Sequence, residues 1–254
     1  MTPEHVLALA SAWVWYPPEA RTIDTDDYLL IAYPPHFSDP TVATRWHSDR
    51  PADELIDEVL DAAHGLDRES VTFFDLSDTT SPRELERRLR ERGGELTETL
   101  AVLALDLTRG APDLAVPEAV EVRRVLTLDD LRATDRIDVA AFGGTHAGEE
   151  ALARSAERLP DEPRYLALRD GVPLGTAGHA IAGQTIRLWG GAVLPEARHT
   201  GVYRALLDTR LRAGVEAGCR TALVKGRVAT SAPVLLRAGF ERFAEVRAYR
   251  LARG

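Results

Sequence analysis

Cysteine is nearly absent from this sequence, and so are long apolar runs. Cys219 is the only cysteine among 254 residues, which excludes a disulfide framework and a cysteine-based metal site. No run of about 18 apolar residues occurs, so we expect no membrane-spanning helix. The first residues lack the basic stretch and apolar core of a signal peptide. Together these absences predict a cytoplasmic protein without a membrane partner.

Lysine is nearly absent too, and the charge is uneven. Lys225 is the only lysine beside thirty arginines, which with the abundant alanine indicates a GC-rich bacterial coding sequence. The net charge of −9 divides into −12 for residues 1–111 (22 acidic, 10 basic) and +3 for residues 112–254 (18 acidic, 21 basic). We expect no nucleic-acid partner for so acidic a chain. The basic excess of the second half suits an anionic cofactor, although an acidic surface that merely aids solubility explains the balance equally well.

A break in the pattern falls near residues 108–118, where two prolines and a glycine separate patterned segments. It predicts a linker between a domain of residues 1–111 and a domain of residues 112–254. Before the break, short apolar runs indicate strands, and apolar residues at helical spacing or Pro and Gly at segment ends indicate helices. The elements predicted there are the strand Tyr28–Tyr33, the helix Ala52–His64, the strand Val71–Leu76, the helix Pro82–Arg92 and the strand Glu98–Leu107.

The second half reads as an α/β (α+β) domain with the order β-α-α-β-β-β-α-β-α-β. Asp170-Gly171 between two apolar runs predicts a hairpin turn. The predicted elements are the strand Ala119–Arg124, the helices Leu128–Ala141 and Glu149–Leu159, the strands Arg164–Arg169, Leu174–Ile181 and Thr185–Leu194, a helix from Gly201 to about Ala217, the strand Thr221–Lys225, the helix Ala232–Ala238 and the strand Phe243–Leu251.

The two halves resemble each other near their ends. The segment 89–95 (Leu-Arg-Glu-Arg-Gly-Gly-Glu) can be laid over the segment 235–241 (Leu-Leu-Arg-Ala-Gly-Phe-Glu), with Leu, Gly and Glu matching. Each segment follows a predicted strand and leads into another one. The match indicates a tandem repeat of one unit, although two independent helix–Gly–strand units would show the same similarity.

The most informative segment is the turn from Arg198 to Tyr203. It follows an apolar strand and opens a helix, whose first N–H groups and macrodipole make a ready site for a pyrophosphate. Gly201 would let the backbone approach the phosphates, and Arg198 supplies a planar fork of donors. Taken alone, most strand–turn–helix segments of this kind bind nothing.

A second element follows in residues 230–241. Ser231 is a candidate N-cap, Gly239 a candidate C-cap, and Phe240 a core residue. Both segments resemble the acyl-CoA motifs of the GNAT acetyltransferase superfamily, which are Arg/Gln-x-x-Gly-x-Gly/Ala and a short polar-capped helix that ends in Gly-Phe. Arg198 and Gly201 fill the first two specified positions, whereas Tyr203 stands where the family usually has a small residue.

The resemblance covers residues 119–251 and implies a mixed, mostly antiparallel sheet flanked by helices. It implies acetyl-CoA as co-substrate, no metal, and a pantetheine arm that pairs with the strand Thr185–Leu194. The first half has no such turn, which implies a smaller, degenerate GNAT-like half without its own CoA site. The residues predicted to contact acetyl-CoA are Ala192, Val193, Leu194, Arg198, His199, Thr200, Gly201, Val202, Tyr203, Ser231 and Arg237.

The catalytic groups are less clear from the sequence. The family often takes its acid from a tyrosine four residues before the glycine of Gly-Phe, a position that Leu235 occupies here. His179 is the one titratable candidate for the proton acceptor, although a strand histidine is as readily structural. Gly190-Gly191 suits a bulge or a close backbone approach. His146, Glu149 and Glu150 are candidates for the acceptor cleft, although a solvated loop and helix start explains them more readily.

These observations predict an N-acetyltransferase that transfers an acetyl group directly from acetyl-CoA to a primary amine. The acceptor would be a small molecule or a peptide, and the protein a monomer or homodimer. A non-catalytic acyl-CoA-binding sensor or scaffold is the alternative, because Leu235 replaces the usual acid and no carboxylate lies on the strand Thr185–Leu194.

Overall fold

The computed structural model describes residues 1–253, and its contacts divide the chain into two units. The C-terminal unit comprises Met1 with residues 103–225 and 234–242. The N-terminal unit comprises residues 2–102, 226–233 and 243–253. This division gives two late segments to the N-terminal unit, whereas the sequence suggested one cut at 111/112. The assignment of domain functions to residues 1–111 and 112–254 stays a prediction.

The N-terminal unit is a sheet with the strand order β1-β2-β3-β4-β11-β5 and one long covering helix. Strands β3 and β4 pair in parallel, and α2 buries the apolar face that its helical spacing predicted. The predicted strands and helices of this half are confirmed, while α1, β1 and β3 were not predicted from the sequence. The elements are α1 (Pro3–Ser11), β1 (Arg21–Asp24), β2 (Leu29–Ala32), β3 (Thr41–Thr44), α2 (Ala52–His64), β4 (Ser70–Leu76), α3 (Leu85–Glu91), most of β5 (Glu95–Asp106) and most of β11 (Glu241–Ala252).

The C-terminal unit has the strand order β10-β9-β8-β7-β6, beside the end of β5. Its pairs are antiparallel except for β9 and β10. All the predicted elements of this half are present, and the hairpin turns at Asp170-Gly171 as expected. They are β6 (Glu121–Arg124), α4 (Leu128–Phe142), α5 (Glu149–Arg158), β7 (Arg164–Arg169), β8 (Val172–Ala182), β9 (Thr185–Val193), the short 3-10 helix η1 (Pro195–Ala197), α6 (Val202–Glu216), β10 (Thr221–Arg227) and α7 (Ser231–Arg237).

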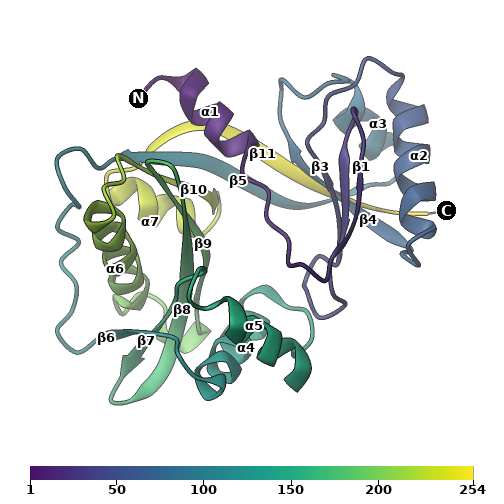
Figure 1. The fold of residues 1–254 in the computed structure, drawn as a ribbon. Helices are drawn as coiled ribbons and strands as arrows, with labels where there is room; N and C mark the ends of the chain where they lie inside the picture. The colour runs from purple at the N-terminus through teal and green to yellow at the C-terminus, as the bar shows by residue number, and fades with distance from the viewer. Residues whose placement is uncertain (254) are drawn as a thin grey trace. The chain divides into compact units, whose positions relative to one another are not determined.

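Helices cover both faces of the C-terminal sheet (Figure 1). The alternation of side chains along β7 separates the two cores: Leu166 and Leu168 pack with α4 and α5, whereas Ala167 packs with α6. Val202 and Leu206 bring the first turns of α6 onto the sheet. The face of β8 and β9 that meets α6 is therefore fixed by close packing.

The suggested repeat has a structural counterpart at the ends of α3 and α7. Gly93 and Gly239 both have positive φ, at 83° and 93°. The next amide in each case turns back onto the matching leucine, from Gly94 N to Leu89 O at 2.8 Å and from Phe240 N to Leu235 O at 3.1 Å. This is the same helix-ending hydrogen bond, which supports duplication of one unit.

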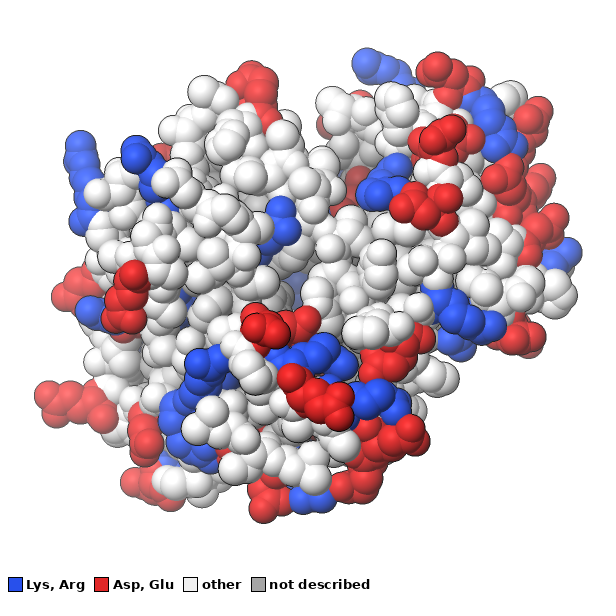
Figure 2. Space-filling view, viewed as in Figure 1, with Lys and Arg blue, Asp and Glu red and all other residues white. Residues whose placement is uncertain are grey.

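Charged side chains are interleaved on the surface. Figure 2 shows acidic and basic groups side by side over α4 and α5, where Arg132 pairs with Glu149 at 2.5 Å and Arg154 with Glu150 at 2.6 Å. No helix within residues 1–253 is long and apolar enough to cross a membrane. The same residues contain no group of three or more His, Cys, Asp or Glu side chains that could hold a metal ion.

The contact between α6 and β9 leads to a stability prediction. A Cβ at Gly214 would lie 2.8 Å from Cγ2 of Ile186, so Gly214→Ala should destabilise the protein by about 1–3 kcal/mol through overpacking. In the Ile186→Ala background the same change should instead stabilise by about 0.5–1 kcal/mol, because alanine is the better helix residue. Denaturant unfolding of the four proteins measures this cycle. If Gly214→Ala changed the free energy of unfolding equally with and without the Ile186 side chain, the predicted contact between residues 214 and 186 would be contradicted.

Candidate functional site

The parallel strands β9 and β10 stay together for only three residue pairs. The last pair is Arg187 with Leu223, yet β9 continues to Val193 and β10 to Arg227. Within residues 1–253, no strand pairs with the side of β9 that faces away from β8 beyond Arg187. We call this backbone, residues 188–193, the open edge of β9. It is a place where an extended molecule could add itself as a further strand.

A bulge bends β9 within this open edge. Gly178 of β8 pairs with Trp189, but Thr176 pairs with Ala192, so β9 carries one extra residue between these pairs. Gly190 has φ of 59°, in the left-handed region that glycine adopts most readily. The bulge predicted at Gly190-Gly191 is thus confirmed. A bulged strand bends and twists more strongly, which fits the separation of β9 from β10.

The hydrogen-bond pattern shows which amide of residues 192–194 faces outward. Leu194 N donates to Leu174 O of β8 at 2.9 Å, and Ala192 is two residues away on the same edge. Antiparallel pairs alternate between bonded and non-bonded, so the N–H of Val193 points away from β8, toward the open edge. Of the three residues predicted to contact the pantetheine arm through their backbone, Val193 is therefore the one whose N–H could bind a ligand at the open edge.

The turn after β9 opens α6 without a side-chain cap. Gly201 is the N-cap residue, with φ of 90° and ψ of −6°, and no acidic residue occupies the first turn. Thr200 Oγ1 donates to Ala197 O at 2.7 Å, and Arg169 holds the Thr200 carbonyl at 3.1 Å. Arg198 and His199 are exposed. The turn thus combines a fixed backbone, uncapped N–H groups and an exposed cation.

Gly201 is required for a reason that the sequence did not reveal. A Cβ on Gly201 would lie 2.4 Å from Cγ of Pro117, in addition to the strain of the positive φ. The glycine is therefore needed by the protein's own packing, whatever binds the turn. Substitution of Gly201 would disturb the fold and cannot by itself report on a ligand.

Tyr203 has a structural explanation for its departure from the family's small residue. A Cβ on Gly191 would lie 3.1 Å from Cε2 of Tyr203, so the ring rests over the side-chain-free Gly191. Its hydroxyl pairs with the guanidinium of Arg210. Truncation of Tyr203 to alanine would leave a void and remove a partner of a buried cation, so we expect it to destabilise the protein.

The residues of α7 agree in part with their predicted places. α7 starts at Ser231, so Thr230 rather than Ser231 holds the N-cap position. Leu235 is 0% exposed and belongs to the core, while Arg237 is exposed. The CoA contacts of Ser231 and Arg237 stay predictions.

His179 does not titrate near neutral pH. It is 3% exposed and stacks on Tyr165 at 5.7 Å between ring centroids. Burial, followed by the charges of Arg210 and Arg124, lowers its pKa to about 4. The sequence could not indicate this shift of the pKa, because a strand position says nothing of how completely the ring is covered. A role for His179 in catalysis stays a prediction, with a neutral imidazole.

A carboxylate that the sequence reasoning missed lies on the opposite face of the sheet. Asp138 of α4 pairs with Arg164 of β7, whose guanidinium sits 5.7 Å above the ring centroid of Trp189 on β9. Oδ1 of Asp138 has no hydrogen-bond partner within residues 1–253. Burial raises the Asp138 pKa, opposed by Arg164 and helped by Asp135. The sequence held no signal for it, because the ion pair joins distant elements.

The acceptor-cleft candidates of the sequence are engaged in surface pairs. Nδ1 of His146 lies 2.7 Å from Asp135. Glu149 and Glu150 make the ion pairs with arginines described above. These contacts tie the segment between α4 and α5 to both helices, and they leave a role at the acceptor as a prediction.

The N-terminal unit also contains a parallel pair, β3 and β4, and the side chain of Trp46 lies beside it. Trp46, just after β3, donates from Nε1 to Phe74 O of β4 at 2.7 Å and stacks on Phe73 at 5.4 Å. The helix that follows, α2, carries Asp53 and Glu54 in its first turn, which disfavours an anion there. The absence of a CoA site in this half stays a prediction.

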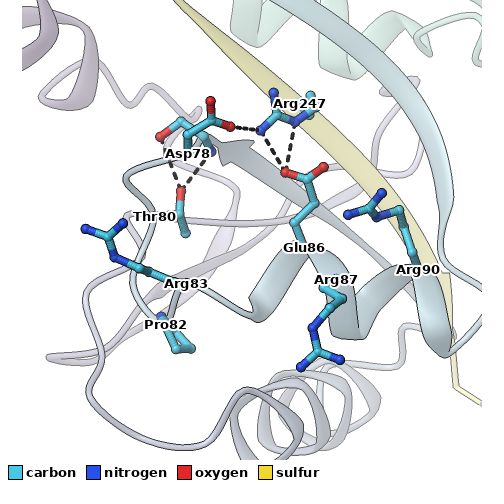
Figure 3. Close-up of a pocket in the computed structure, with 9 residues that line it drawn as sticks. Asp78, Thr80, Pro82, Arg83, Glu86, Arg87, Arg90 and Arg247 are labelled. Atoms are coloured by element: carbon cyan, nitrogen blue, oxygen red, sulfur yellow. Dashed lines mark hydrogen bonds and ion pairs between the residues drawn. The ribbon is translucent and has the colours of Figure 1, made fainter.

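A pocket of about 390 Å³ lies in the N-terminal unit, between the segment after β4 and α3. One of its arginines, Arg247, is neutralised by Asp78 at 2.7 Å and by Glu86 at 2.8 Å. Arg83 and Arg87 point away from this ion-paired group (Figure 3). The guanidinium groups do not converge, so we assign no ligand to this pocket.

The lowered pKa of His179 predicts a pH dependence of stability. An unfolded histidine titrates near 6.5, so the unfolded state binds more protons between pH 6.5 and about 4. Stability should therefore be complete above this window and fall by about 3 kcal/mol as the pH drops through it. His179→Phe should lose this part of the pH dependence, and the exposed His5→Phe control should keep it. The measurement is the free energy of unfolding by denaturant between about pH 4 and 7.5. If it depended on pH equally in the parent and both variants, the lowered pKa could not belong to His179.

The acetyltransferase (GNAT) family model matches residues 130–240. No curated protein sequence matches the chain. Among solved structures, GCN5-related N-acetyltransferases from Kribbella flavida and Sphaerobacter thermophilus superpose with TM-scores of 0.68 and 0.64 at 17% and 18% identity. They cover 100% and 98% of this chain, and 96% and 85% of their own.

A tandem GNAT protein from the clavulanic acid biosynthesis pathway superposes with a TM-score of 0.59 at 14% identity, covering 98% of this chain and 88% of its own. At these identities the likeness concerns the fold. The family match and the fold agree with the mixed, mostly antiparallel sheet flanked by helices that the sequence predicted. Residues 130–240 thus match the GNAT acetyltransferase family model, and the chain as a whole has the fold of these solved structures, the tandem GNAT protein among them.

Proposed function

We propose that the protein is an acetyl-CoA-dependent N-acetyltransferase that acts on a primary amine of a small molecule or peptide. One observation carries the proposal: the open edge of β9 runs directly into the uncapped start of α6. A single segment thus offers a strand edge for an extended amide-bearing arm and, a few residues later, N–H groups for an anion. We expect the protein to act in the cytoplasm as a monomer or homodimer.

Each part of acetyl-CoA has a matching feature. The pyrophosphate suits the start of α6, where the dipole is positive and Arg198 adds a fixed charge. The pantetheine amides suit the backbone of Val193 by strand addition. An N–H of the bulged open edge would polarise the thioester carbonyl as an oxyanion-hole donor does.

The transfer needs one bond to form and one to break. The neutral amine attacks the thioester carbonyl carbon, a C–N bond forms, and the C–S bond breaks to release the CoA thiolate. The amine nitrogen gives up a proton, and the thiolate takes one up. We propose Asp138 as the proton acceptor, supported by its unpartnered Oδ1, its raised pKa and its link through Arg164 to Trp189 on β9.

The alternative is a sensor or scaffold that binds acyl-CoA without turnover. The observation that favours it is Leu235, an apolar core residue where the family often has a tyrosine acid. Because CoA thiolate is a tolerable leaving group, an enzyme without this acid remains chemically feasible. Turnover separates the two functions.

The pyrophosphate contact is tested by charge reversal at Arg198. Arg198→Glu should weaken acetyl-CoA binding by about 2 kcal/mol or more, roughly 30-fold, because a charge-assisted contact is replaced by repulsion. Binding of acetyl-pantetheine, which lacks the pyrophosphate, should be unchanged. The matched control is Arg212→Glu on the exposed face of α6. Calorimetric titration measures the binding of both ligands to both variants. If Arg198→Glu bound acetyl-CoA as tightly as the parent protein does, the pyrophosphate would have to lie elsewhere.

The activity itself is tested by release of free CoA thiol from acetyl-CoA over a panel of small and peptide amines. We expect turnover above the protein-free rate, and a loss of about 100-fold in kcat for Asp138→Asn with little change in acetyl-CoA affinity. The loss should shrink at high pH, where the amine is already neutral. Tight binding without any turnover would favour the sensor. Turnover that is unaffected by Asp138→Asn would remove Asp138 from the mechanism and leave the acetyltransferase intact.

A further inference from the structure

Arg210 is the largest fully buried side chain of the protein, at 1% exposure. It lies on α6, on the helix face that meets β8 and β9. Its Nε donates to Leu206 O at 3.0 Å, and its guanidinium pairs with the Tyr203 hydroxyl. No carboxylate within residues 1–253 forms an ion pair with it. A buried cation with only neutral partners is costly, and an apolar side chain of similar volume would often be more stable. Because stability does not explain this guanidinium, we consider the groups to which it donates hydrogen bonds.

The guanidinium of Arg210 donates hydrogen bonds to the backbone at the bulge of β9. Nη1 of Arg210 donates to Gly178 O at 3.3 Å and to Trp189 O at 3.4 Å. Gly178 and Trp189 face each other in the last pair before the register shifts. One guanidinium thus binds a carbonyl of β8 and a carbonyl of β9 where the extra residue enters β9, next to Gly190 with its left-handed backbone. Without these donors, two carbonyl groups in the interior would lose a partner.

The same guanidinium reaches the turn at the start of α6. Tyr203 belongs to the first turn of that helix, rests over Gly191 of the bulge, and pairs with Arg210 through its hydroxyl. A Cβ on Gly191 would also approach Nη2 of Arg210 at 3.7 Å. Arg210 therefore connects the segment proposed for the pyrophosphate with the segment proposed for the thioester.

We infer that Arg210 is a positioning residue for acyl transfer: by fixing the Gly178 and Trp189 carbonyls and the Tyr203 hydroxyl, it aims the backbone of the open edge at the thioester carbonyl. The inference rests on the proposed function. Arg210 touches neither the acyl group nor the acceptor, so its loss should misplace the polarising N–H without removing the contacts that bind CoA. Small misplacements of this kind reduce rate more than affinity.

The test compares Arg210→Met, Arg210→Lys and Tyr203→Phe with the parent, and uses Arg212→Met on the exposed face of the same helix as the matched control. Three quantities are measured on each folded protein: kcat by thiol release, acetyl-CoA affinity by calorimetry, and the 13C shift of the thioester carbonyl in bound [1-13C]acetyl-CoA. The carbonyl shift reports polarisation directly, and a merely structural role would not move it at parental affinity.

Arg210→Met should lower kcat at least about tenfold, keep the acetyl-CoA affinity within about threefold, and return the carbonyl shift toward that of free acetyl-CoA. Arg210→Lys should recover part of both effects, because one ammonium can serve one carbonyl. Tyr203→Phe should lower kcat about threefold. Arg212→Met should match the parent in all three measurements.

Parental kcat and carbonyl shift in folded Arg210→Met would overturn the inference, as would an effect confined to affinity. If Arg210→Met does not fold, Arg210→Lys and Tyr203→Phe decide, and parental values in both would overturn it equally. A parent protein that binds no acetyl-CoA and releases no thiol refutes the proposed function and the inference with it. An active parent with an unaffected Arg210→Met refutes the inference alone.

Discussion

The separation of β9 from β10 after three paired residues is the feature on which the rest of the C-terminal unit depends. Backbone N–H and C=O groups seldom stay unpaired inside a protein, so a strand edge left open in this way is available to a further strand or an extended ligand. The bulge at Gly190-Gly191 bends β9, and the close packing of α6 holds it in place. Because the strand leads straight into the uncapped start of α6, its geometry also fixes where an anion can be held.

The two units place different side chains around similar elements. Each contains a parallel pair followed by a helix, and the helix-ending hydrogen bonds at Leu89 and Leu235 are alike. In the N-terminal unit the indole of Trp46 fills the space beside β4, and the next helix begins with two acidic residues. In the C-terminal unit the corresponding helix begins with Gly201 and carries no acidic residue in its first turn. The difference lies in a few side chains.

Local patterns predicted every helix from α2 to α7 and most strands, because periodicity and turn chemistry depend on neighbouring residues. They did not predict α1. Features made by distant residues were not predictable. Pro117 explains Gly201, and the cover over His179 lowers its pKa, yet neither contact leaves a trace in the local sequence. Arg210 looks like an ordinary surface charge on a helix until the sheet carbonyls appear beside it. The strands β1 and β3 were missed because, unlike the equally short β2, they are not continuous runs of apolar residues.

The central claim is that acyl-CoA occupies the open edge of β9 and the start of α6. Amide hydrogen exchange, followed residue by residue by NMR with and without acetyl-CoA, tests it most directly. The account predicts that acetyl-CoA slows exchange at Val193 and at residues 198–203. Leu194, already bonded to β8, should change little, and the segment around Trp46 should not respond. Unchanged exchange at Val193 and in the turn, with protection at residues 44–51 instead, would contradict the account.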